Sequence, residues 1–437
     1  MSQSLRLSQT IVLAFSIFAI FFGAGNLIFP PIVGFQSGEN SLAAVLGFLL
    51  IAVGLPTLST VAFATIEGNV GSITDKISTK FTFVYTCAIY LLIGPMFAIP
   101  RTAIVANEMA VVPFVSEYTS LSMVLLIFSF LYFLSIYLFC IYSTKVIEIV
   151  SKYIIPLLLF TVLLLIAGAI IWPVSTAGEP LGNFYANPLI TGMLDGFLTM
   201  DSLGTFIIVS IVITRLNEMG ITESPAIIKY TIRAGILSGI ALCVVYAGLA
   251  YIGITSDVPI TTTNGGLILV RSAMNSFGLI GMILLAISVF IACFTTALTL
   301  IIGASRFFHK TFPSISEKNF LRACVLFSFL VSNLGFDVLM SITVPVLDIA
   351  YPITILVVAF TMFRNHINGI TSKIGMLVCC IVSIAFILYE HVGMKYENFG
   401  MDLPIFPMIP LFSEGLGWVI PTTIAVVITM VATKSRD

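Results

Sequence analysis

The feature that most limits the folds open to this chain is a succession of apolar segments, each about as long as a membrane-spanning helix. Backbone groups in the hydrocarbon core meet no water, so such segments cross it as α-helices. Only 9% of the residues are charged, far fewer than a soluble domain carries. We therefore predict an all-α integral membrane protein, a single domain over residues 1–437 with about twelve transmembrane helices. The expected helices are 9–35, 41–66, 81–111, 121–142, 153–172, 189–213, 228–254, 277–304, 320–335, 338–361, 372–390 and 416–433.

Twelve crossings place both termini on the same side of the membrane. If that side is the cytoplasm, every lysine and arginine except Arg101, Arg271 and Lys395 falls on the cytoplasmic side. Cytoplasmic loops of membrane proteins carry an excess of positive charge. The distribution therefore predicts a multi-pass protein with both termini in the cytoplasm.

The first apolar segment is interrupted where a membrane helix should be continuous. Residues 21–31 read FFGAGNLIFPP, and the glycines and asparagine favour an unwound turn. Unpaired backbone groups at membrane depth need protein, water or a ligand as partners. An unwound helix is a good indicator of a transporter's binding site, and a plain glycine kink at a helix contact is the alternative interpretation.

The sixth expected helix has a second polar break at residues 198–205, LTMDSLGT. If helices 1–5 (about 9–172) and 6–10 (about 189–361) are two halves, their odd helix number gives them opposite orientations. Helices 11–12 (about 372–433) would then follow the repeat. We expect this 5+5 inverted repeat of the leucine transporter type, with broken helices 1 and 6 meeting near the midplane.

Both breaks offer groups for binding. At the first, N–H groups at the start of the outer half-helix can bind a carboxylate, and the carbonyls of Ala19 and Phe22 can ligate a small cation. At the second, Asp201 is ionisable within an expected span, and Thr199 and Ser202 add oxygens. Asp201 could serve cation or proton coupling, or could cap the half-helix that follows.

Three residues of the eighth expected helix share one face. Ala292, Thr295 and Thr296 are spaced i, i+3 and i+4, so two hydroxyls and a carbonyl can point together. Sodium is a hard cation that such neutral oxygens suit. Threonines in membrane helices also bond back to their own backbone. Combined with the first break, the pattern favours cation ligation.

The third expected helix carries two charges inside the membrane region. Arg101 and Glu108 are two helical turns apart and can share a face, as a structural ion pair or at an outer vestibule. Asp348 in the tenth helix is a further buried-charge candidate, and no partner for it is evident from the sequence.

Several function classes lack their motifs. The chain has no phosphate-binding glycine loop followed by Lys-Ser or Lys-Thr, and no nucleophile elbow. We expect neither an enzyme nor an ATP-driven pump, no cofactor beyond a coupling ion, and no nucleic-acid partner. Membrane lipid is the expected surrounding. A channel would need a continuous lined pore, for which no ring of charge is found, and a sensor would need a soluble output domain.

Two segments, FGAGNLIFPP at 22–31 and GPMFAIPRT at 94–102, resemble the signatures of the bacterial branched-chain amino acid:cation symporters. The resemblance covers essentially the whole chain. This symporter family belongs to the amino acid-polyamine-organocation superfamily. It implies import of leucine, isoleucine and valine across the bacterial cytoplasmic membrane by alternating access. The driving cation is expected to be Na+, with H+ as the alternative. The alternative is a proton-coupled or exchange-type carrier for other neutral amino acids on the same fold.

The resemblance also implies roles for individual residues. The leucine transporter's gating arginine is matched here by Phe29, so Arg101 with Glu108 or Asp348 is the expected replacement gate. The implied substrate-binding residues are Gly23, Ala24, Gly25, Asn26, Thr199, Met200, Asp201 and Ser202. The implied sodium ligands are Ala19, Phe22, Ala292, Thr295 and Thr296.

Overall fold

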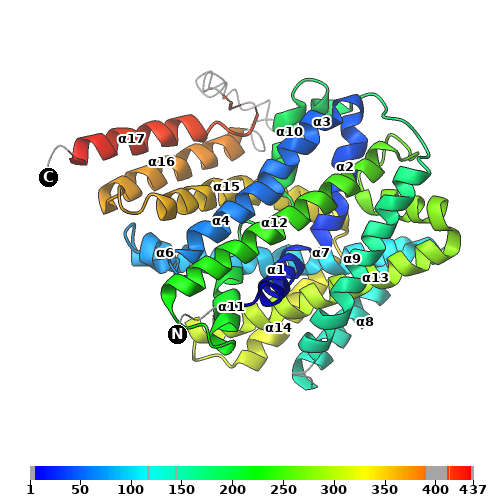
Figure 1. Ribbon diagram of the computed structural model, residues 1–437, viewed down its shortest axis with the longest axis horizontal. Helices are drawn as coiled ribbons and strands as arrows, with labels where there is room; N and C mark the ends of the chain where they lie inside the picture. The colour runs from blue at the N-terminus through cyan, green and yellow to red at the C-terminus, as the bar shows by residue number, and fades with distance from the viewer. Residues whose placement is uncertain (1–4, 116–118, 143–145, 390–410, 413, 435–437) are drawn as a thin grey trace.

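The structure, a computed structural model, describes residues 5–115, 119–142, 146–389, 411–412 and 414–434. Every regular element in these residues is helical (Figure 1). The α-helices of the first half are α1 (Leu7–Phe21), α2 (Ala24–Ser37), α3 (Ser41–Leu49), α4 (Leu55–Ala64), α5 (Gly71–Thr74), α6 (Thr79–Leu91), α7 (Ala98–Ala110), α8 (Leu121–Tyr142) and α9 (Val146–Ile171). Those of the second half are α10 (Pro188–Phe197), α11 (Thr205–Glu218), α12 (Ser224–Ile254), α13 (Gly265–Thr311), α14 (Glu317–Ser332), α15 (Phe336–Met362), α16 (Gly369–Ile387) and α17 (Val419–Lys434).

The predicted all-helical class is confirmed. Seven of the described helical segments are long and apolar enough to cross a membrane. One of them, Ala24–Ala64, joins the second half of the first expected helix to nearly all of the second expected helix. The number of long apolar segments therefore does not give the number of membrane crossings. The twelve crossings and the 5+5 repeat stay predictions. Residue 390, the end of the eleventh expected helix, and Lys395 lie outside the described residues.

One helical segment lies outside every expected helix. Helix α13 consists of two segments that meet at a kink at Gly278, where φ is +60°. The second segment covers the eighth expected helix, 277–304, and continues to Thr311, whereas the first, from Gly265 to the kink, is not among the expected helices. The missed stretch carries Arg271 and Asn275, so a criterion of unbroken apolar character rejects it. Glycine tolerates the positive φ because it has no Cβ.

Both predicted breaks are present. The first expected helix is divided into α1 and α2 at Phe22 and Gly23. The sixth is divided into α10 and α11 by residues 198–204, and within this stretch Met200 has φ +65°. A side chain in this left-handed region costs roughly 1–2 kcal/mol, so the surrounding contacts must hold the second break in its shape.

The half-helix α2 lies in backbone contact with α12. A Cβ added at Gly34 of α2 would come 2.0 Å from the Ala250 carbonyl oxygen of α12. A Cβ added at Gly253 of α12 would come 1.9 Å from the Pro31 carbonyl oxygen of α2. Glycine at both positions allows the close approach that membrane helices often use. The two helices therefore meet without intervening side chains.

The half-helix α10 meets α3 in the same way. A Cβ at Gly47 of α3 would lie 2.0 Å from the Leu189 carbonyl oxygen, and one at Gly192 of α10 would lie 2.0 Å from the Ala44 carbonyl oxygen. In each pair, the half-helix next to a break is seated on a neighbouring helix.

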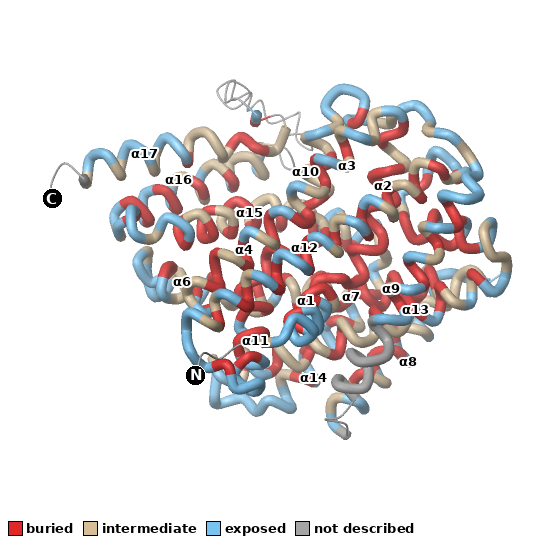
Figure 2. The backbone as a smooth tube through the Cα atoms, viewed as in Figure 1, coloured by how far each residue is buried: buried red, intermediate tan, exposed pale blue. Residues whose placement is uncertain are grey.

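The break in the first helix lies deep in the molecule. Every residue from 21 to 34 is buried, and Figure 2 shows the buried backbone concentrated where α1, α2, α7 and α12 come together. Helices α16 and α17 pack on each other at one edge, beside α15 and away from the breaks (Figure 1).

Candidate functional site

The two breaks are joined through the side chain of Asn26. Its Nδ2 donates a hydrogen bond to Asp201 Oδ2 at 2.7 Å and contacts the Tyr246 hydroxyl on α12. Its Oδ1 accepts the N–H of Gly23 at 3.4 Å. The Tyr246 hydroxyl also donates to Asp201 Oδ2, at 3.2 Å. We call Asn26, Asp201 and Tyr246 the break cluster. All three side chains are buried, so the cluster is a closed polar network in an apolar interior.

Asp201 does not cap the half-helix that follows it. The N-cap position of α11 is Gly204, three residues later, no side chain caps this helix, and the carboxylate of Asp201 accepts hydrogen bonds from Asn26 and Tyr246. The backbone carbonyl of Asp201 accepts the Thr205 hydroxyl at 3.1 Å, which fixes the turn from the other side. Of the two roles left open by the sequence, the structure therefore excludes capping.

The remaining residues expected at the second break are also buried. Thr199 donates its hydroxyl to the Gly196 carbonyl at 2.9 Å, and Met200 and Ser202 are buried beside it. At the first break, Gly23, Ala24 and Gly25 are buried as well. The structure thus brings both expected halves of the substrate site into one region.

Arg101 of α7 lies between the two breaks. Its Nη1 donates to the Leu198 carbonyl at 2.7 Å, at the start of the second break. A Cβ at Gly25 in the first break would come 2.5 Å from its Nη2, so the guanidinium fills the space that a side chain there would need. Its Cζ stands 5.4 Å from the centroid of the Phe29 ring, a cation–π distance.

The expected pairing of Arg101 with Glu108 is not what the structure shows. Glu108 accepts a hydrogen bond from Asn264, which also caps α13 by accepting the N–H of Gly266 at 2.8 Å. Seven residues of helix span about 10 Å, so each charged side chain takes a partner from a neighbouring segment instead. Asp348 lies half-buried on α15, and the described contacts of Arg101 do not include it.

The five expected sodium ligands line a single small cavity. Its volume is about 10 Å³, near the minimum that admits one water-sized species. The Thr295 hydroxyl donates to the Ala292 carbonyl at 3.0 Å, which leaves the lone pairs of its oxygen available. The lining residues are Phe18, Ala19, Phe22, Leu158, Ala292, Thr295 and Thr296.

The first break changes the partners of two carbonyls in that cavity wall. In a continuous helix, the N–H groups of Gly23 and Asn26 would donate to the carbonyls of Ala19 and Phe22. In the structure the Gly23 N–H donates to the Phe21 carbonyl at 2.8 Å, and the Asn26 N–H donates to the Gly23 carbonyl at 3.2 Å. The carbonyls of Ala19 and Phe22 therefore lose their helical donors, as the ligand prediction requires.

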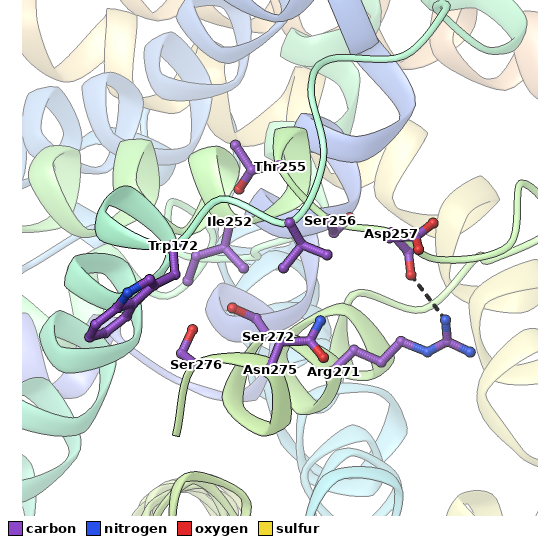
Figure 3. A pocket seen from close by; sticks show the side chains of 11 residues that line it. Trp172, Ile252, Thr255, Ser256, Asp257, Arg271, Ser272, Asn275 and Ser276 are labelled. Carbon is purple, nitrogen blue, oxygen red and sulfur yellow. Dashed lines mark hydrogen bonds between the residues drawn. The ribbon is translucent and has the colours of Figure 1, made fainter. Parts of the chain in front are cut away.

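A second cavity, also of about 10 Å³, lies apart from the breaks where α9, α12 and α13 come together (Figure 3). Trp172, Asn275 and Ser276 line it, and Arg271 Nη1 donates to the Asp257 carbonyl at 3.0 Å at its edge. None of the expected site residues lines this cavity.

Sequence reasoning missed Tyr246. It is fully buried, packs with its ring centroid 6.2 Å from that of Phe22 and 5.9 Å from that of Phe48, and completes the break cluster. In the sequence it is one of three tyrosines in a largely apolar helix, with no motif around it. Its partners come from elements more than 40 residues away, so no local signal could have identified it.

Comparison with known proteins shows the family of this chain. The family model described as "Branched-chain amino acid transport protein" matches residues 6–436, almost the whole chain. This chain is a branched-chain amino acid transport family protein. The resemblance seen in the two sequence signatures is thereby confirmed, and the family is one of transport proteins.

Curated relatives of this branched-chain amino acid transport family protein agree. The branched-chain amino acid transport system 2 carrier protein of Pseudomonas aeruginosa is 36% identical over 426 residues, 97% of this chain and 96% of the relative. The branched-chain amino acid permease BrnQ of Salmonella typhimurium is 34% identical over 433 residues, 99% and 97% of the two chains. The permease BrnQ of Bacillus subtilis is 36% identical over 424 residues, 96% of each.

Solved structures show that the family protein has a transporter fold. A manganese transporter of Eremococcus coleocola aligns with a TM-score of 0.60 at 14% identity, over 97% of each chain. Mhp1, a nucleobase-cation-symport-1 family transporter, aligns in a closed conformation with a TM-score of 0.55 at 14% identity, over 97% of this chain and 92% of Mhp1. At such identities the likeness concerns the fold alone.

Proposed function

We propose that this protein is a secondary active symporter that imports leucine, isoleucine and valine together with a cation by alternating access. The proposed cation is Na+, with H+ as the alternative. The relatives' names supply the substrate class. The observation that carries the mechanism is the meeting of two helix breaks at the break cluster, because unwound membrane helices supply the ligands of secondary transporters. We also propose the 5+5 inverted repeat, with both termini at the cytoplasmic face of the bacterial cytoplasmic membrane.

In this proposal the substrate binds at the two breaks. The first N–H groups of α2, at Ala24 and Gly25, lie at the positive end of a helix dipole and face the substrate's carboxylate. The residues from Thr199 to Ser202 complete the site on the other side, and apolar residues nearby hold the branched side chain.

The coupling cation, in this proposal Na+, occupies the cavity between α1 and α13. Its ligands are the carbonyls of Ala19, Phe22 and Ala292 and the hydroxyls of Thr295 and Thr296. A Cβ at Gly23 would lie 3.5 Å from Thr296, so this cavity adjoins the first break. Sodium there stabilises the unwound turn and raises affinity for the substrate. By linkage, leucine must raise sodium affinity by the same factor.

Replacing Thr295 and Thr296 together with alanine is expected to raise the sodium concentration for half-maximal uptake at least about 10-fold. Each hydroxyl lost from a charged partner costs about 1.5–3 kcal/mol. Thr299→Ala is the matched control, since its hydroxyl bonds to the Thr295 carbonyl at 2.9 Å and does not line the cavity. The measurement is uptake of labelled leucine against sodium concentration, and an unchanged sodium dependence in the double variant would remove this assignment.

The function itself is tested by leucine uptake into proteoliposomes under a sodium gradient, a proton gradient, or neither. Saturable, sodium-driven uptake that isoleucine and valine compete is the expected result. Uptake driven by protons alone would move the coupling site to the carboxylates of Asp201 and Asp348. Uptake that occurs only after preloading with unlabelled amino acid would show an exchanger and overturn symport.

A further inference from the structure

The buried guanidinium of Arg101 is incompletely satisfied by the protein. Arg101 is only 4% exposed to solvent. A buried charge is costly unless it is paired and hydrogen-bonded. Arginine has five N–H donors. Nη1 has the Leu198 carbonyl, whereas Nε is buried and lacks a partner in the described part of the chain. The group therefore has donors to spare in an interior that provides no bulk water.

The carboxylate of Asp201, at the second break, is engaged by other donors. Its Oδ2 accepts hydrogen bonds from Asn26 and Tyr246, and among the described residues no hydrogen bond joins it to Arg101. Asp201 thus acts on the charge of Arg101 without using its donors. A second anion between the two breaks would complete the guanidinium's hydrogen bonds.

The guanidinium of Arg101 reaches the first break. Nη2 lies where the side chain of Gly25 would be, next to the start of α2. The guanidinium, with its unpartnered Nε, and the N-terminus of α2 are therefore neighbouring groups of donors, and a planar guanidinium suits a carboxylate.

We propose that Arg101 binds the α-carboxylate of the transported amino acid. The inference rests on the proposed function and goes beyond it, because it gives the substrate site a positively charged side chain and a reason to require a free carboxylate. Arg101 then acts as a specificity-determining residue instead of half of an ion pair with Glu108.

The competing explanation is structural. Arg101 could serve only to hold the second break through Leu198, in which case its loss should weaken every ligand equally. The two explanations differ for an analogue that keeps the ammonium and the branched side chain but lacks the carboxylate. Leucinamide is such an analogue.

The test is binding of leucine and of leucinamide to the purified full chain with sodium present, from the ligand dependence of the unfolding temperature. Wild type should prefer leucine. Arg101→Gln should weaken leucine binding about 10- to 100-fold, the range for a lost charge-assisted hydrogen bond, and leave leucinamide unchanged. Arg271→Gln is the matched control, an exposed arginine in the second cavity, and should keep the wild-type preference.

Arg101→Lys is a second variant, for the case in which Arg101→Gln does not fold. It keeps the positive charge and loses the planar fork of donors. It should weaken leucine about 5- to 10-fold with leucinamide unchanged. If both variants bind leucine as wild type does, or lose both ligands equally, the inference is overturned while the proposed function stands. If wild type binds no leucine with either sodium or protons, the proposed function fails and this inference fails with it.

Discussion

Replacement of Asp201 with alanine is expected to lower leucine uptake at least about 100-fold. The change leaves the Asn26 amide and the Tyr246 hydroxyl without their shared acceptor in a buried site. Each hydrogen bond to a charged group contributes about 1.5–3 kcal/mol, so two of them account for at least a factor of 100. It also removes the charge that balances Arg101. The measurement is initial uptake into proteoliposomes at equal amounts of reconstituted protein.

Two comparisons separate the charge from the hydrogen bonds. Tyr246→Phe removes one donor and keeps the carboxylate, so a smaller loss is expected, and the double variant with Asp201→Ala should lose less than the sum of the two single effects. Asp257→Asn is the control, a carboxylate exposed at the edge of the second cavity. Full additivity of the two changes would mean that the break cluster does not act as a unit.

Substitution of Gly253 with valine is expected to lower the stability of the folded protein. Its Cβ would come 1.9 Å from the Pro31 carbonyl oxygen, and the obstacle is backbone, which cannot turn aside as a flexible side chain can. Overpacking costs about 1–3 kcal/mol and sometimes more. We expect a lower unfolding temperature and lower uptake, measured on the same purified protein.

The matched control for Gly253→Val is Gly303→Ala. Gly303 lies within α13, and a Cβ there would meet nothing within 4 Å. Alanine stabilises a helix interior by about 0.8–1 kcal/mol over glycine, so this variant should be as stable as wild type or more so. A Gly253→Val protein with unchanged unfolding temperature would show that α2 and α12 can separate at little cost.

The features predictable from the sequence are those encoded locally. Glycines and Asn26 within an apolar run forecast the first break, because their effect on the backbone does not depend on distant contacts. Helical spacing placed Thr295 and Thr296 on one face, and the structure brings that face to the cavity beside Ala19. The all-helical class followed from apolar length alone.

The features that escaped prediction depend on tertiary contacts. Arg101 and Glu108 lie on the same helix at a spacing that predicts an ion pair. In the structure Arg101 instead donates to the Leu198 carbonyl, and Glu108 accepts a hydrogen bond from Asn264. Tyr246 becomes part of the site only because α12 carries it to both breaks. Periodicity cannot report such meetings, since each joins positions separated by dozens of residues or more.

The backbone of Met200 has a consequence for the balance between conformations. At φ +65° it carries roughly 1 kcal/mol or more of strain that any state with a negative φ would release. About 1 kcal/mol corresponds to roughly a fivefold change in relative population. The strain at Met200 therefore favours conformations other than the described one. A ligand that stabilises the second break in the described conformation must offset this strain energy with its binding energy.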